Sequence, residues 1–143
     1  MAHHMASLKQ PCMQFEPAFE YGDLEKVKIE YTTTGRNVTT RSRKVPAFSG
    51  KGGIEALLYC EDHFRSACTH MYVPAGPDQF DLFSEIMQNT AETTWTTVSG
   101  AYVGDANCTA ANFEAAIQSL SLTMWTIKLG ILCWNIYKEY INL

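Results

Sequence analysis

Apolar residues between positions 80 and 98 recur every three or four residues. At 100° per residue this spacing places them on one side of a helix, which is typical of a helix packed on a core. The stripe consists of Phe80, Phe83, Met87, Ala91, Trp95 and Val98. Asn89 stands three residues before Glu92, a spacing at which a side-chain cap and a carboxylate satisfy free backbone donors at a helix start. We therefore predict two short helices that meet at a tight corner, with Trp95 packing back across it.

An alternating pattern precedes these helices, where Val27, Ile29 and Tyr31 are separated by charged residues. Such alternation, followed by the turn-forming run TTTGRN, predicts a β-hairpin with residues 26–32 paired to residues 37–45. Because an isolated hairpin is marginally stable, it has to pack on the helices or on another chain. Residues 1–25 combine an opening that resembles an expression tag, MAHHM, with scattered prolines and aromatics, which predicts an extended arm.

A further apolar stripe covers residues 54–73 and ends before Pro74, which predicts one helix. Its apolar positions are Ile54, Leu57, Phe64, Cys68 and Met71. Glu61 falls inside the stripe, and the sequence alone does not explain it. The preceding FSGKGG segment either cradles an anion with backbone N–H groups or forms a plain turn. The turn is favoured because the full phosphate-loop pattern is missing.

The C-terminal segment predicts the longest helix, with Thr109 as its candidate N-cap. One stripe runs through Phe113, Ile117, Leu120, Met124, Ile127 and Ile131, and beyond Leu122 a second stripe follows on the opposite side, through Trp125, Leu129, Leu132 and Ile136. A helix that is apolar on both sides must be enclosed by a membrane, a larger core or a partner. Lys128 makes a membrane span unfavourable. We therefore expect an apolar helical tail at residues 123–143, with the second stripe as candidate interface.

Composition describes an ordinary globular chain. Its 143 residues allow one domain, and 46% hydrophobic with 18% charged residues is typical of folded proteins. A net charge of -4 argues against a protein whose whole surface wraps nucleic acid. The five cysteines are scattered, without a CxxC pair or a preceding secretory signal. We therefore expect reduced thiols and a cytoplasmic location.

No motif in the sequence predicts catalysis, a cofactor or a metal. There is no GxSxG elbow, and His63 and His70 are seven residues apart, about 10 Å along a helix, too far to share one ion readily. A basic run without acidic residues is a candidate patch for phosphates or an acidic partner, and a solvated hairpin edge explains it about as well. It contains Arg36, Arg41, Arg43 and Lys44.

Three segments, in this order, resemble the capsid region of Gag proteins from Gypsy-type LTR retrotransposons. KVPAFSGKGGIEALLYCEDHF resembles that family's opening of Pro, Phe and Gly before the first helix; FSEIMQNTAETTW is similar to its Ala and Trp signature, and TAANFEAAIQSL to the helix that follows. The resemblance covers roughly residues 44–122. It implies a capsid N-terminal lobe, a mostly α fold of four to five bundled helices preceded here by a β-hairpin. The expected structural core is Phe48, Gly50, Leu57, Phe64, Phe83, Ala91, Trp95 and Phe113.

The resemblance also implies a non-enzymatic structural protein that assembles with copies of itself around RNA. We therefore expect an arm at residues 1–25, a capsid-like lobe at residues 26–122 and the tail at residues 123–143. The tail does not match the family's polar linker and second lobe, and no CCHC zinc knuckle is present, so RNA binding is only weakly indicated and a truncated or domesticated element is expected. The alternative function is a domesticated adaptor that binds peptide segments in a hydrophobic groove.

Overall fold

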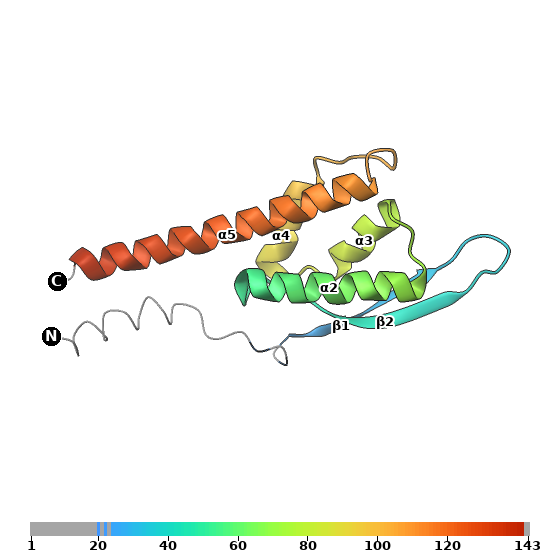
Figure 1. Ribbon diagram of the computed structural model, residues 1–143, viewed down its shortest axis with the longest axis horizontal. Coiled ribbons are helices and arrows are strands. Elements are labelled where there is room, and N and C mark those ends of the chain that lie inside the picture. The colour runs from blue at the N-terminus through green and yellow to red at the C-terminus, as the bar shows by residue number, and fades with distance from the viewer. Residues whose placement is uncertain (1–19, 21, 23, 142–143) are drawn as a thin grey trace.

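The computed structural model describes residues 20, 22 and 24–141 of the chain, and this part is mostly helical, as predicted (Figure 1). Its elements are β1 (Lys26–Thr32), β2 (Thr40–Pro46), α2 (Gly53–Met71), α3 (Pro77–Glu85), α4 (Asn89–Ser99) and α5 (Ala110–Ile141). The two strands form the predicted antiparallel hairpin, and four helices follow it. The expected arm at residues 1–25 lies almost entirely outside the described residues.

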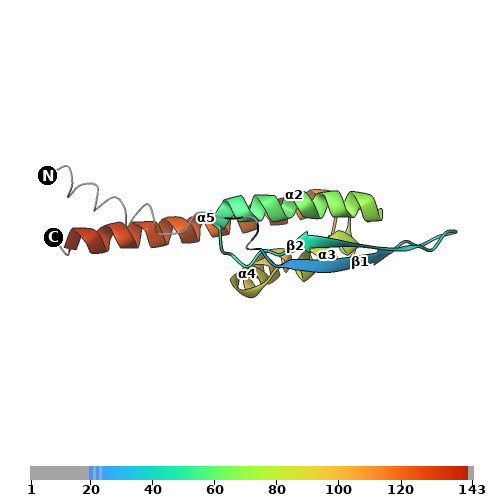
Figure 2. The ribbon, with the colours of Figure 1, turned by 90° about the horizontal axis from the view of Figure 1, so that it is seen from below.

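The hairpin packs on the helices rather than standing alone. Its register runs from Lys26 opposite Pro46 to Thr32 opposite Thr40. The second strand therefore begins at Thr40, later than the predicted residue 37, because a longer loop is closed by the Thr33 N–H donating to the Thr39 carbonyl at 2.9 Å. Ile29 is fully buried, and α2 lies along the hairpin (Figures 1 and 2).

The segment after the hairpin docks into the corner between α3 and α4. The Phe48 N–H donates to the Ile86 carbonyl, and the Phe48 carbonyl accepts from the Gln88 N–H, both at 2.9 Å. The following FSGKGG segment is a turn into α2, in which Gly50 and Gly52 have φ values of 102° and 84°. Glycine is needed there because side chains rarely tolerate positive φ. The chain thus crosses from hairpin to helix while holding the α3–α4 corner in place.

Trp95 packs across this corner, as predicted. Its ring lies 4.7 Å from Phe83 and 6.1 Å from Phe80, between ring centroids, and its Nε1 donates to Ser84 Oγ at 3.0 Å. Phe113 of α5 packs against the same rings. The predicted cap was wrong, because Asn89 is the first residue of α4, with φ of 52°, and the preceding Gln88 makes no side-chain capping bond. The corner is held by aromatic packing and backbone pairing instead.

Helix α5 belongs to the core only along its first half. The Asn112 N–H donates to Thr109 Oγ1 at 3.1 Å, so the predicted cap is confirmed. Five residues of this half are buried, namely Phe113, Ala116, Ile117, Leu120 and Met124. Beyond them the helix leaves the other elements and projects alone among the described residues (Figures 1 and 2). Ile127 and Ile131, which continue the buried stripe along the helix, are exposed.

Candidate functional site

The second half of α5 carries most of the large apolar side chains that the fold leaves exposed. Ten of them lie within this helix, and each is between 40% and 74% exposed. They are Leu122, Trp125, Ile127, Leu129, Ile131, Trp134, Ile136, Tyr137, Tyr140 and Ile141. We call residues 125–141 the projecting half; it extends about 25 Å at 1.5 Å per residue. With roughly 100 Å² exposed on each side chain, the ten expose about 1,000 Å² of apolar surface around this helix.

Two apolar stripes run along different sides of this helix, roughly 150° apart at 3.6 residues per turn. The lobe-side stripe continues the buried face of α5 and comprises Phe113, Ile117, Leu120, Met124, Ile127, Ile131 and Trp134. The outer stripe comprises Leu122, Trp125, Leu129, Leu132 and Ile136. Four of these outer residues, all except Leu122, are the predicted interface residues. Leu132 is half-buried and the other four are exposed.

Polar and small residues separate the two stripes. Lys128 and Asn135 lie between them on one side of the helix, and Thr123, Thr126 and Gly130 on the other. The Thr123 and Thr126 hydroxyls donate to backbone carbonyls one turn earlier, both at 2.8 Å. By length and composition α5 could also cross a membrane, and it is the one such helix in the described residues. The division into stripes nonetheless gives this helix two distinct contact faces.

Seven of the eight expected core residues are buried. Phe48, Leu57, Phe64, Phe83, Ala91, Trp95 and Phe113 are each no more than 2% exposed. Gly50 is only half-buried, and its place is in the turn before α2, where a Cβ would come within 3.9 Å of the Thr90 Cβ. Gly50 therefore shapes the entry into α2 rather than filling the core.

The four candidate basic residues do not share one face of the hairpin. Side chains alternate along a strand, so Arg41 and Arg43 lie on the face that carries Ile29, whereas Lys44 lies on the other face, opposite Lys28. Arg36 lies in the connecting loop. The Arg41 guanidinium stacks over the Tyr72 ring at 4.6 Å, at the end of α2. The hairpin thus spreads these charges instead of gathering them on one strand face.

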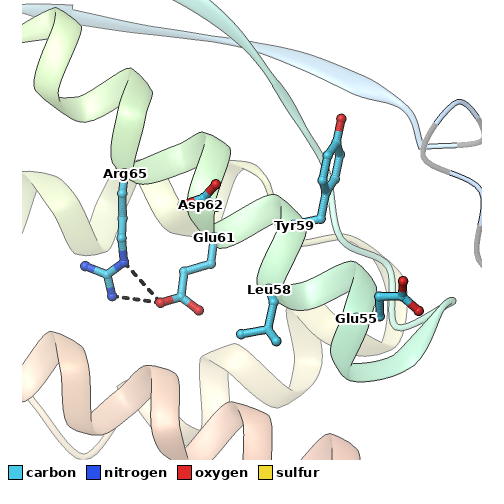
Figure 3. A pocket seen from close by; sticks show the side chains of 6 residues that line it. All are labelled: Glu55, Leu58, Tyr59, Glu61, Asp62 and Arg65. Atoms are coloured by element: carbon cyan, nitrogen blue, oxygen red, sulfur yellow. Dashed lines mark hydrogen bonds and ion pairs between the residues drawn. The ribbon is translucent and has the colours of Figure 1, made fainter.

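A cavity of about 510 Å³ lies beside α2 (Figure 3). Five of its six lining residues carry polar groups; the set is Glu55, Leu58, Tyr59, Glu61, Asp62 and Arg65. All six residues belong to α2, and four of them are charged. The cavity therefore lies along one helix with charged groups around it, whereas a peptide adaptor is expected to have a hydrophobic groove.

The contacts of Glu61 beside this cavity explain why a charged residue falls inside the apolar stripe of α2. Arg65 donates to Glu61 from Nε and Nη2, at 3.0 and 2.9 Å, and its Nη1 lies 2.8 Å from Oε1 of Glu114 on α5. Burial by itself lowers the pKa of Arg65, but the hydrogen bonds to Glu114 and Glu61 outweigh it and raise the pKa. Arg65 thus fastens α2 to α5. Sequence reasoning missed this contact, although the four-residue spacing of Glu61 and Arg65 was visible.

The cysteines and histidines that the structure describes do not form a metal site. Among the described residues, no three His, Cys, Asp or Glu side chains are placed to hold one ion. His63 packs on the Tyr59 ring, and the Nδ1 atom of His70 lies 2.8 Å from the Ser66 carbonyl oxygen. Burial raises the pKa of Cys60 to about 12 and that of Cys68 to about 11. Both thiols therefore stay protonated and inert at neutral pH.

Comparison of the chain with protein-family models, with curated proteins and with solved structures finds no match. The chemistry of the described residues therefore has to carry the functional argument. Its dominant feature is the exposed apolar surface of α5.

Proposed function

We propose that this chain is a non-enzymatic structural protein that associates with copies of itself through the projecting half of α5. The observation that carries the proposal is the set of ten exposed apolar side chains on one helix. Water strongly disfavours such a surface, and its estimated 1,000 Å² exceeds the roughly 800 Å² that each partner buries in a standard protein interface. Association is the direct way to remove it from water.

The Gag-like capsid hypothesis supports the same function. A hairpin followed by helices with an aromatic core agrees with the resemblance of residues 44–122 to a capsid N-terminal lobe. The task of such a lobe is to pack against copies of itself. We therefore propose a capsid-like assembly role, with the tail replacing contacts that a second lobe would otherwise make.

A peptide adaptor and an RNA-binding protein receive less support from the described residues. The cavity beside α2 is lined by residues of that helix alone, four of them charged, and the hairpin's basic residues divide between two strand faces and a loop. An apolar peptide needs an apolar groove, and phosphates need clustered positive charge. Self-association is therefore the function we propose.

The solution mass, measured by size exclusion with light scattering over a range of protein concentrations, tests this function. We expect a mass above the 16.1 kDa of one chain, growing with concentration and persisting at high salt, because apolar association is not screened by ions. A variant with lysine at Ile127, Leu129, Ile131 and Ile136 should remain monomeric. Val103→Lys, at a loop residue that is 73% exposed, is the control and should assemble like the wild type. A wild-type monomer at every concentration would refute the proposal.

A further inference from the structure

We propose that the outer stripe of α5 pairs with the outer stripe of a second copy, antiparallel, about a two-fold axis level with residues 130 and 131. The inference rests on the proposed function and adds to it the contact face, the register and the direction of the partner. The lobe-side stripe takes no part in this contact.

The spacing of the outer stripe supports a helix pair. Its positions follow one another at alternating steps of three and four residues, the seven-residue repeat of a coiled-coil seam. Antiparallel pairing about residues 130 and 131 places Trp125 opposite Ile136 and Leu129 opposite Leu132. Because the axis is two-fold, each contact occurs twice. Four consecutive core layers are then entirely apolar.

The direction follows from the same residues. A parallel pair in register would place Trp125 opposite Trp125 of the partner, and two indoles would have to share one layer. It would also place both lobes at the same end, although the chain carries a net charge of -4. The antiparallel pair matches the indole with the smaller Ile136 and keeps the lobes apart.

The fold leaves the outer stripe open to such a partner. The lobe covers the opposite side of α5, where Phe113 and Leu120 are fully buried. Leu122 is 66% exposed although it belongs to the half of the helix that packs on the lobe. A partner helix can therefore lie along α5 from Leu122 to the end of the helix without displacing any other described element.

The size of the surface fits a weak, specific dimer. The four residues of the apolar layers and Leu122, which this register places opposite Glu139 of the second copy, give about 500 Å² per copy at roughly 100 Å² each. The total of about 1,000 Å² is that of weak, transient interfaces. Dimerisation should therefore depend on concentration. Lys128, Asn135 and Gly130 stay between the stripes, outside the seam, which suits a protein partner on one face better than lipid on all sides.

Two matched variants in the full chain test which stripe is used. Leu129→Lys with Ile136→Lys changes the outer stripe, and Ile127→Lys with Ile131→Lys changes the lobe-side stripe. The four residues are similarly exposed, between 40% and 50%, so both pairs add the same charge at comparable positions. We expect the outer pair to give monomers by light scattering and the lobe-side pair to retain the dimer. Circular dichroism should confirm that both variants are folded.

Cross-linking tests the direction. Trp125→Cys and Ile136→Cys are made in separate preparations, both carrying Cys133→Ser, and are then mixed under mild oxidation. We expect disulfides mainly between the two different variants, because a parallel pair would separate these positions by about 16 Å along the axis. Disulfides formed only within each variant would overturn the antiparallel register.

The outcomes separate this inference from the function on which it rests. If the lobe-side pair alone dissociates a wild-type oligomer, self-association stands and the outer seam is refuted. A wild type that remains monomeric refutes both. Binding of the wild type to phosphatidylcholine vesicles that both pairs weaken equally would overturn the seam in favour of lipid contact, since lipid surrounds a helix on all sides.

Discussion

The two halves of α5 have similar residues and opposite surroundings. In the first half, Phe113 and Leu120 are fully buried, and Phe113 packs against rings of α2, α3 and α4. In the second half, Ile127 and Ile131 continue the same stripe and are 43% and 41% exposed. The helical pattern does not change where the lobe ends. Burial is therefore decided by the neighbouring elements and not by the helix itself.

This difference separates two roles for apolar residues in one chain. In the lobe they create a unique packed core, in which Trp95 contacts Phe80, Phe83 and Phe113. In the projecting half they are organised as stripes for a neighbour. Stability should therefore respond to substitutions in the lobe, and assembly to substitutions in the projecting half.

Two tryptophans give the sharpest contrast and the largest expected effect. Trp95 is 2% exposed and Trp134 is 56% exposed. Trp95→Ala should lower the free energy of unfolding by about 3 to 5 kcal/mol, because it leaves a cavity among aromatic rings and removes the hydrogen bond to Ser84 Oγ. Trp134→Ala should change it by no more than about 0.5 kcal/mol. Urea unfolding followed by circular dichroism, at one fixed protein concentration, measures both. Equal losses of unfolding free energy in the two variants would contradict the distinction between a packed lobe and an exposed projecting half.

Thiol labelling gives a second contrast, smaller in its consequence for the fold. Cys60 and Cys68 are buried in the lobe, whereas Cys133 is exposed on the projecting half. Alkylation of Cys60 and Cys68 should be slower by roughly a thousandfold or more, because it requires opening of a domain whose stability is typically at least about 5 kcal/mol. Their raised pKa values, about 12 and about 11, slow the reaction further at pH 8. Mass spectrometry of the labelled peptides measures each cysteine separately.

The position of Cys133 makes the same experiment informative about assembly. Cys133 borders the outer stripe, four residues after Leu129 and three before Ile136. Its labelling rate should therefore fall as protein concentration rises and the chain dimerises. A labelling rate that stays constant while the solution mass rises would place the contact on a different face.

Local patterns in the sequence predicted the elements of the lobe because local physics decides them. The 80–98 stripe, the alternation from Val27 to Tyr31 and the cap at Thr109 each depend on residues a few positions apart, and the structure has the corresponding helices, hairpin and cap. Contacts between distant segments were missed. The backbone pairing of Phe48 with Ile86 and Gln88 cannot be predicted from the spacing of apolar side chains.

The candidate surface could be predicted only in part for the same reason. The outer stripe was visible as a pattern from Trp125 to Ile136. The sequence did not show that the lobe ends after Met124, because the apolar spacing of the lobe-side stripe continues where the neighbouring elements of the lobe end. The basic run also looked continuous in the sequence, although strand alternation divides Arg43 from Lys44. Which stripe takes a partner remains a prediction.

The smallest expected effect concerns how the hairpin is tied to the lobe. The Tyr31 hydroxyl donates to Asp78 Oδ2 at 2.9 Å, at a solvent-accessible site that joins β1 to α3. Tyr31→Phe should therefore cost only about 0.5 kcal/mol near pH 7, the lower end for one hydrogen bond. Projecting-half properties, such as the solution mass, should not change.

The direction in which pH changes the stability from this contact follows from the pKa of Tyr31. Burial, and then the hydrogen bond and charge of Asp78, raise the pKa of Tyr31 in the folded state. The stabilisation is thus complete below the unfolded pKa of about 10 and is lost as pH rises through the higher folded value. The wild type should lose its advantage over Tyr31→Phe above pH 10, and Asp78→Asn, which removes the charge but keeps an acceptor, should weaken that loss. Urea unfolding at several pH values measures the difference, and parallel profiles for the wild type and Tyr31→Phe would show that Tyr31 does not couple the hairpin to the lobe.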